Sequence, residues 1–577
     1  MNINRGFTMH AGNYVLILHT HLPFVLHHGD WPHGTDWLCE AVAECYIPLL
    51  NVFNELLEEG ITPKVTLDIS PVLCEQLEHP DFKVIFEKYC EHKIKAAQSD
   101  REEFSKEGKP QHQIWLTEYW ENWFKERLND YKYIYNSSVI NALKELQDKG
   151  AIEIMTCGAT HGYFPLLADD RSINLQVKAA VANYQKHFGR KPRGIWLPEC
   201  AYRPAYTWQT YLTVDPYHTP YWRRGVEEFL AENGIEYFVV DEQTNRRAQP
   251  IGILKDGHFT SVHSPDFKSY HYNFDNSPLN LFRAASGDNV SKGTAVAFAR
   301  HQDVAMQVWS AESGFPGNPA YLDFHKKQGG SMHRYWRVTD VKADMADKLL
   351  YVPDWVSGAN GAYAQTFVHS IERTLQEYRN EAWREGTLTT PFDTELFGHW
   401  WFEGPGFLKE VLRNIHYSPY VNMKTAGEQL DYIQPTEVAL LPESSWGRDG
   451  NHNVWVNDKT LWTWKSIYRA EQRMNELVEK TINCRNDETL CRIMLQAMRE
   501  LMLMQASDWQ FLIETGSARD YAEMRFANHR TDYNALCHMA EMYLSEKRLS
   551  KEDEAFLKEV EDRNPVFPEL KLEWWKK

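Results

Sequence analysis

The sequence of 577 residues lacks several features that would assign it to a familiar class of protein. No segment approaches the roughly 18 uninterrupted apolar residues of a membrane span, and the run from Tyr14 to Leu18 is too short for a signal-peptide core. The nine cysteines include no Cys-x-x-Cys pair, so they suggest neither a disulfide framework nor a zinc ribbon. We therefore expect an unexported cytoplasmic protein that does not bind membranes.

Basic side chains are scarce relative to acidic ones. Lys and Arg total 62 against 80 for Asp and Glu, which gives a net charge of -18 at pH 7. This charge argues against binding to nucleic acid or an anionic membrane, because both require a basic face that displaces counterions. The chain also has no internal repeat or Gly/Ser linker. We expect two or three closely packed domains, in a monomer or a small homo-oligomer.

Aromatic residues, in contrast, are abundant. The chain has 21 Trp, 29 Tyr and 27 Phe, which together make 13% of its residues. Most of these rings will fill cores, but rings also form platforms for a neutral ligand with many apolar C–H faces. Carbohydrate is the ligand class that fits this composition best.

Short β-rich runs alternate with segments of helical periodicity along much of the chain. Strand-type sequences occur at 14–18, 64–70, 152–162, 194–199, 236–242, 295–300 and 387–395. A series of strands with helical crossovers predicts an α/β protein built on a parallel β/α barrel, which is incomplete here.

Two parts of the chain interrupt this alternation. Residues 76–149 are rich in Glu, Lys and aromatic side chains without strand signals, so we expect a helical insertion there. After about residue 426 no convincing series of strands remains, and stretches such as "LWTWKSIYRAEQRMNELVEK" have helical spacing. The predicted organisation is a barrel formed by 1–75 and 150–425, the insertion, and a C-terminal helical domain over 426–577.

Polar side chains with catalytic potential follow the predicted strands. In a β/α barrel the carboxyl ends of the strands meet on one face, where the active site forms. One such residue is often structural, because a histidine can simply be hydrogen-bonded and an aspartate can cap the next helix. Five strand ends that carry His, Asp or Glu side chains in one protein favour a functional site. The residues are His19 and His21, His161, Glu199, Asp241 and Glu242, and Asp393.

Glu199 stands out among them. In "GIWLPECAYRP" it follows an apolar strand, with Trp196 as a desolvating wall and Pro198 removing a backbone donor. Hydrolysis or transfer of a sugar requires two carboxyl groups that flank the glycosidic bond. We therefore predict that Glu199 and Asp393 form a catalytic pair.

Several motifs containing these residues resemble the ordered sequence blocks of glycoside hydrolase family 57. The blocks are "LHTHLP" (18–23), "GATHGYFP" (158–165), "WLPECAY" (196–202) and "PFDTELFGHWW" (391–401). Four further motifs resemble the 1,4-α-glucan branching-enzyme branch of that family, including its helical C-terminal domain. These are "QVWSAESGFPGNPAYLDFH" (307–325), "RYWRVT" (334–339), "SSWGRDGNHNVWVN" (444–457) and "QASDWQFLI" (505–513).

The resemblance implies a retaining mechanism on a seven-stranded β/α barrel without a metal or other cofactor, acting on α-1,4-glucans such as amylose, glycogen or maltooligosaccharides. Glu199 matches the family nucleophile and Asp393 the general acid/base. His19, His21 and His161 match positions that line the donor-glucose subsite. The remaining matches, in the glucan cleft, are Trp37, Trp309, Trp446, Trp455 and Asp508.

The sequence departs from the family pattern in two places. Thr20 occupies a position where relatives often have a smaller residue, and the polar stretch 98–113 is longer than the family needs. Neither departure includes the catalytic pair.

Three alternatives remain open. A metal-dependent hydrolase such as a polysaccharide deacetylase could bind zinc through His19, His21 and His161. A glucan-binding scaffold could use the aromatic rings without turnover. Within the family, an α-amylase or 4-α-glucanotransferase can share the same glycosyl-enzyme intermediate, because these enzymes differ in the acceptor.

The stretch from about 243 to 293 bears on the choice of acceptor. So long a polar connection after a strand is commonly a lid or a disordered excursion. As a lid it would keep water from the intermediate while Tyr270 or Tyr272 stacks on the glucan acceptor, which favours branching. The alternative is a surface hairpin with the tyrosines packed beneath it.

Overall fold

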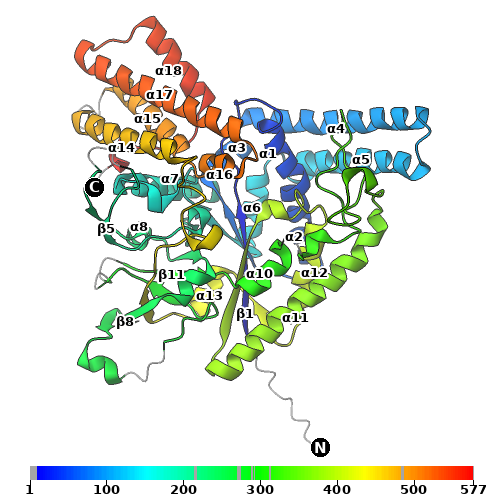
Figure 1. The fold of residues 1–577 in the computed structure, drawn as a ribbon, viewed down its shortest axis with the longest axis horizontal. Helices are drawn as coiled ribbons and strands as arrows, with labels where there is room; N and C mark the ends of the chain where they lie inside the picture. The colour runs from blue at the N-terminus through cyan, green and yellow to red at the C-terminus, as the bar shows by residue number, and fades with distance from the viewer. Residues whose placement is uncertain are drawn as a thin grey trace, which may run out of the picture.

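The computed structural model describes residues 10–212, 217–269, 274–287, 290, 293–310, 313–481 and 487–575. A mixed sheet lies at the centre, a helical pair projects from one side of it, and a group of helices covers one end (Figure 1). Within the described ranges, no helix is both long enough and apolar enough to span a membrane.

Seven parallel strands form the main part of the sheet, and each corresponds to a segment predicted as a strand. They are β1 (Gly12–Thr20), β2 (Val65–Ile69), β3 (Ile152–Cys157), β4 (Gly194–Trp196), β7 (Tyr237–Val240), β11 (Ala295–Ala299) and β12 (Gly386–Asp393). Their pairing order is β12-β1-β2-β3-β4-β7-β11, with every pair parallel. A parallel bridge between Arg300 and Thr389 also joins the residue after β11 to β12.

The remaining strands extend or flank this parallel group. Among the described residues the sheet has twelve strands, and a separate hairpin has two. The additional strands are β13 (Val421–Met423), β10 (Phe282–Ala284), β14 (Glu437–Leu440), β8 (Gln249–Lys255) and β9 (His258–Ser261), and the hairpin is β5 (Tyr206–Trp208) with β6 (Tyr221–Arg223). The stretch predicted as one long polar connection therefore contains three of these strands, and β14 lies beyond the predicted end of the barrel.

Helices pack around the sheet and connect its strands. They are α1 (Thr35–Ala41), α2 (Ile47–Glu58), α3 (Pro71–Glu78), α6 (Val139–Asp148), α7 (Asp170–Phe188), α8 (Val226–Glu232), α9 (Glu242–Arg246), α10 (Gln302–Trp309), α11 (Val356–Ala382), α12 (Gly404–His416) and α13 (Ala426–Tyr432). Helix α7 illustrates the local signals: the Asp169 side chain accepts a hydrogen bond from the Arg171 amide, and Gly189 ends the helix in the left-handed conformation.

The part of the chain predicted as a helical insertion is helical. Its two longest helices, α4 (Pro80–Lys106) and α5 (Gln111–Asn129), pack against each other and project from the sheet in Figure 1. The polar stretch 98–113 forms the end of α4, the turn and the start of α5. Its length therefore extends this helical pair.

The C-terminal region is also helical and lies over the carboxyl ends of the parallel strands (Figure 1). Its helices are α14 (Leu461–Thr481), α15 (Glu488–Met504), α16 (Asp508–Thr515), α17 (Arg519–Glu546) and α18 (Lys551–Arg563). A bridge between Gly162 and Ala506 and a hydrogen bond of 2.9 Å from the Ser507 amide to the His161 carbonyl join it to the loop after β3. These contacts bring Ser507 and Asp508 to the strand ends.

Candidate active site

The register of three neighbouring strands places polar groups side by side. His19 near the end of β1 is level with Asp393 on β12 and with Asp68 on β2. In a parallel sheet these positions share one edge, so the strand pairing alone assembles a histidine and two carboxyl groups. Asp68 was not among the residues predicted from the sequence.

Glu199 lies in a sharp turn after β4. Its backbone is left-handed, with φ of 62°, and Cys200 follows with φ of 48°. This conformation is rare for residues other than glycine and costs about 1–3 kcal/mol, which the surrounding contacts must offset. Trp446 supplies two of those contacts: its amide donates to the Glu199 carbonyl at 3.0 Å and its indole N–H to carboxylate Oε2 at 2.8 Å. The strained turn aims the carboxylate at the strand-end face.

The other carboxylate oxygen of Glu199 accepts a hydrogen bond from the C-terminal region. The Ser507 hydroxyl donates to Oε1 at 3.0 Å. Burial raises the pKa of Glu199 to about 7, and the nearby Asp508 carboxylate acts in the same direction. The donors Trp446 and Ser507 act in the opposite direction, because they stabilise the ionised form.

Asp393 at the end of β12 has a more strongly perturbed acidity. Burial raises the pKa of Asp393 well above its usual range, and the carboxyl groups of Glu395 and Glu199 raise it further. The positive charge of Arg300 acts in the opposite direction but is the weakest of these effects. Two carboxyl groups in environments this different can divide the roles of carboxylate and carboxylic acid.

The three predicted histidines form a stack beside Glu199. The rings of His21 and His161 are 4.0 Å apart between centroids, and His19 stacks on Trp196 at 4.5 Å. Burial lowers the pKa of His19 and His161 well below the usual range, so both rings are neutral. A neutral ring has one donor and one acceptor nitrogen, and in His19 and His161 both nitrogens contact other protein side chains.

Two sets of these side chains are close enough to share a metal ion. The ligand atoms of His19, Cys157 and His161 lie within 4.8 Å of one another, as do those of His21, His161 and Asp508. The His21 nitrogens, however, already contact Ser70 Oγ at 2.7 Å and Asp508 at 3.1 Å. A metal in the second set would break these contacts, so this geometry favours hydrogen bonding by His21.

The four predicted cleft tryptophans have different environments. Trp446 is half-buried and contacts Glu199, and Trp37 and Trp309 are also half-buried. Trp455 is only 1% exposed, and its ring packs against Tyr163 with 4.6 Å between centroids. This burial favours a role for Trp455 in joining the C-terminal region to the barrel.

The predicted lid tyrosines, Tyr270 and Tyr272, lie outside the described residues. Before them, β8 pairs with β14 and then with β9, in the lower left of Figure 1 and away from α16. Asp241 caps α9 by accepting from the Gln243 amide at 3.1 Å. That strand-end carboxyl group thus has the structural role that the sequence left open.

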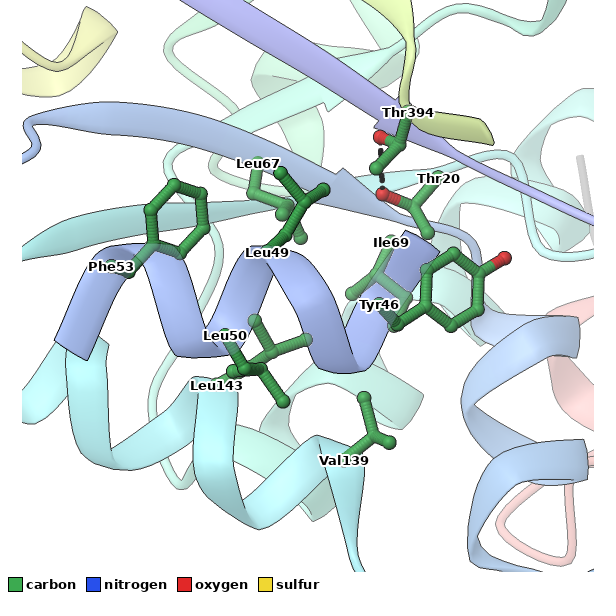
Figure 2. A pocket seen from close by; sticks show the side chains of 10 residues that line it. All are labelled: Thr20, Tyr46, Leu49, Leu50, Phe53, Leu67, Ile69, Val139, Leu143 and Thr394. Carbon is green, nitrogen blue, oxygen red and sulfur yellow. Dashed lines mark hydrogen bonds between the residues drawn. The ribbon is translucent and has the colours of Figure 1, made fainter. Parts of the chain in front are cut away.

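Thr20 links the carboxyl ends of β1 and β12, two of the strand ends that carry polar side chains. Its hydroxyl group is hydrogen-bonded to that of Thr394 at 2.7 Å, which joins the end of β1 to the residue after Asp393 on β12. Figure 2 shows this pair above apolar side chains of α2, α6 and β2, around a cavity of about 10 Å³. The larger residue at position 20 is therefore accommodated by a specific contact.

Comparison with known proteins agrees with this geometry. The family model for glycosyl hydrolase family 57 matches residues 15–442, and the model for the C-terminal part of 1,4-alpha-glucan branching enzyme matches 466–575. A 1,4-alpha-glucan branching enzyme of Thermococcus kodakarensis is 38% identical over 559 residues, which cover 96% of this chain and 78% of that protein.

Two solved structures are similar over nearly their whole length. The branching enzyme of Pyrococcus horikoshii has a TM-score of 0.86 and 36% identity, with 98% of this chain and 97% of that chain covered. The α-amylase AmyC of Thermotoga maritima has a TM-score of 0.79 and 29% identity, with 99% of both chains covered. The extent of these matches shows that the chain belongs to glycosyl hydrolase family 57.

Proposed function

We propose that this protein is a 1,4-α-glucan branching enzyme. It cleaves an α-1,4-glucan with retention of configuration and transfers the released segment to a 6-hydroxyl group, which forms an α-1,6 branch. One observation carries the proposal: buried Glu199 is held by Trp446 and Ser507, both beyond the barrel, in a chain similar along 96% of its length to a branching enzyme.

The proposed reaction is a double displacement. Glu199 attacks the anomeric carbon, the glycosidic C–O bond breaks, and Asp393 gives its proton to the leaving 4-oxygen. In the second step Asp393 takes the proton of the acceptor 6-hydroxyl group, whose oxygen displaces Glu199. The raised pKa of Asp393 supports its role as the acid, and the two donors to Glu199 support its role as the nucleophile.

Other side chains would bind the glucan. We assign the donor-glucose subsite to the stacked rings of His19, His21 and His161, whose nitrogens contact protein groups, so that their ring faces and edges would line the subsite. Half-buried rings offer stacking surfaces for glucose units. These rings are Trp37, Trp309 and Trp446, with Asp508 as a further polar contact.

The proposed architecture follows the sequence-based division. The seven parallel strands would form an incomplete barrel, with seven strands in place of the usual eight, in which the Arg300–Thr389 bridge joins the two end strands. The domain boundaries would lie near residues 75, 150 and 426. The cysteines in the described part of the chain form no disulfide, which suits the reducing cytoplasm, where glucan polymer would be the substrate.

An α-amylase is the second candidate, and the structural similarity to AmyC favours it specifically. Its first step would be identical, and water would replace the 6-hydroxyl group as acceptor. Incubation with amylose distinguishes the two: we expect new α-1,6 linkages in excess of new reducing ends. Reducing ends without branches would assign the chain to the hydrolases, and loss of both activities in chelator with recovery on zinc would favour a metal-dependent enzyme.

A further inference from the structure

A continuous chain of hydrogen bonds leads from the barrel interior to Glu199. Asp68 Oδ2 contacts His19 Nδ1 at 2.5 Å, and His19 Nε2 contacts His161 Nε2 at 3.1 Å. His161 Nδ1 then contacts Ser507 Oγ at 2.8 Å, and Ser507 donates to Glu199 Oε1 at 3.0 Å. These contacts connect β1, β2 and the segments that follow β3 and β4 with the C-terminal region.

The donor atom of each hydrogen bond in this series can be deduced by starting at Glu199. A serine hydroxyl group has one proton, and Ser507 uses it for Glu199, so His161 Nδ1 must be the donor to Ser507. A neutral His161 then has an unprotonated Nε2, which must accept from His19 Nε2. In a neutral His19 the remaining nitrogen, Nδ1, is an acceptor.

The other arrangement, a protonated His19 beside an ionised Asp68, would bury two charges with one carboxylate oxygen unpaired. Asp68 is therefore the donor, which requires a neutral carboxyl group. Its surroundings agree: Asp68 is fully buried, His19 is its only partner in the described salt bridges, and its Oδ1 has no hydrogen-bond partner there. An unpaired oxygen of a buried carboxylate would be far more costly than the carbonyl oxygen of a neutral acid. Burial also raises the pKa of Asp68 well above its usual range.

Packing fixes the rings in these positions. His19 lies nearly parallel to the Trp196 ring, with an interplanar angle of 11°, and His161 is stacked on His21 at the same angle. The backbone of His161 is held by the Ser507 amide, 2.9 Å from its carbonyl oxygen. Neither ring can turn without losing both a stacking and a hydrogen-bonding partner.

We propose that Asp68 and Ser507 are positioning residues that fix the histidine tautomers and thereby orient the Glu199 carboxylate for attack. Asp68 determines which nitrogen of each histidine carries the proton, and Ser507 donates the last hydrogen bond of the series to Glu199 Oε1. The inference rests on the proposed function only in taking Glu199 as the nucleophile.

Substitutions at Asp68 test the direction of the chain. In Asp68→Asn an amide N–H can still donate to His19 Nδ1, so we expect kcat within a few-fold of the wild type. Asp68→Leu removes the donor, and we expect kcat for amylose cleavage to fall roughly 100-fold with KM changed little. Thr156→Val on β3 is the matched control, because the buried Thr156 hydroxyl group has no hydrogen-bond partner among the described residues. Equal loss in Asp68→Asn and Asp68→Leu would contradict a neutral donor.

Substitutions at Ser507 test whether the two ends act together. We expect Ser507→Ala to lower kcat by a similar factor and Ser507→Thr to restore most of it. Asp68 and Ser507 share no contact, yet the double variant Asp68→Leu/Ser507→Ala should be no slower than either single variant, because one broken link already interrupts the chain. Multiplicative losses would show two independent effects and overturn the proposal.

Nitrogen NMR of histidine-labelled protein provides a readout that does not depend on activity. We expect a neutral His161 protonated at Nδ1 and a neutral His19 protonated at Nε2, with the His161 preference lost in Ser507→Ala. The opposite tautomers would contradict the proposed hydrogen-bond series even if the enzyme were active. If the wild type cleaves amylose but forms no α-1,6 linkages, branching fails as the function, while the kinetic and NMR results still decide the role of Asp68.

Discussion

Burial sets the acidity of the proposed nucleophile and couples it to folding. The pKa of Glu199 is about 7 in the folded protein against about 4.5 for an ordinary glutamate. Between these values the folded chain retains a proton that the unfolded chain has lost, so stability falls as pH rises through this window. Above pH 7 the burial of the ionised Glu199 lowers the free energy of unfolding by about 3 kcal/mol. The burial that raises the pKa of the proposed nucleophile therefore also makes the fold less stable at high pH.

This linkage predicts a pH-dependent effect of Glu199→Gln on stability. The neutral amide avoids burial of a charge, so the variant should gain thermal stability relative to the wild type as pH rises from about 4.5 to above 7. Calorimetric melting temperatures of both proteins across this range measure the difference. A constant difference at all pH values would mean that Glu199 titrates normally.

The catalytic roles predict the effect of the pair on turnover. Glu199→Gln and Asp393→Asn should each reduce amylose cleavage by several orders of magnitude while the circular dichroism spectrum is retained. In the wild type, activity should fall as pH drops through about 7, where Glu199 becomes protonated. It should fall again at higher pH, where Asp393 loses its proton. Near-normal activity in either variant would remove that residue from the mechanism.

The two tryptophans of the "SSWGRDGNHNVWVN" segment should behave differently. Trp455→Ala removes a fully buried ring, so we expect a loss of about 3–5 kcal/mol in unfolding free energy with smaller kinetic effects in the folded fraction. Trp446→Phe keeps the ring but loses the indole donor to Glu199, so kcat should fall at nearly unchanged stability. Denaturant unfolding and steady-state kinetics together separate the two outcomes, and matching profiles would contradict this division.

The sequence predicts residues of the site that end a strand, and it misses those whose role depends on distant partners. Glu199 follows the apolar strand β4 and Asp393 ends β12, so the sequence alone is enough to propose both. Asp68 lies inside the strand "VTLDI", and Ser507 precedes a helix, where serine is ordinary. The Ser507–Glu199 contact spans 308 positions and forms only after the C-terminal region packs on the barrel. No local pattern records such a pairing.

At the level of elements, the same limit applies to the added strands. The seven parallel strands were predicted because they are short runs rich in apolar or β-branched residues, and nearly all of their positions are buried. Strands β8 and β9 are only partly buried, so their sequences read as a polar connection. Their pairing depends on β14, which is 4 residues long and isolated among helical segments.

This arrangement defines how the lid hypothesis should be tested. Residues after 273 should be kept, because Asp275 pairs with Arg384 at 2.9 Å and Asn280 donates to Glu437 at 2.6 Å. Replacing only 264–273 with a short Gly/Ser link should raise the ratio of new reducing ends to α-1,6 linkages while total cleavage persists. An unchanged ratio would show that this segment does not exclude water.

At the scale of the whole molecule, the C-terminal helices and the part of the chain that carries the parallel sheet share one buried polar network. Glu471 on α14 accepts hydrogen bonds from the Ala168 amide at 3.0 Å and from the hydroxyl of Ser172 on α7 at 2.6 Å. Gln505 donates to the same carboxyl group at 3.2 Å, two residues before Ser507. The contact that holds the two parts together is therefore continuous with the active site.

This continuity predicts that activity and structure are lost together on heating. Inactivation and the far-UV circular dichroism transition should share one midpoint, because separation of the helices also removes Ser507 from Glu199. Glu471→Ala leaves the buried Ala168 amide and Ser172 hydroxyl without this acceptor and removes one of the two acceptors of Gln505 Nε2. Both midpoints should therefore fall together, with a loss of about 2–4 kcal/mol in stability. The exposed Glu476 on the same helix is the control, and Glu476→Ala should change neither midpoint. Loss of activity well below the structural transition would instead mean that the C-terminal helices separate from an intact barrel.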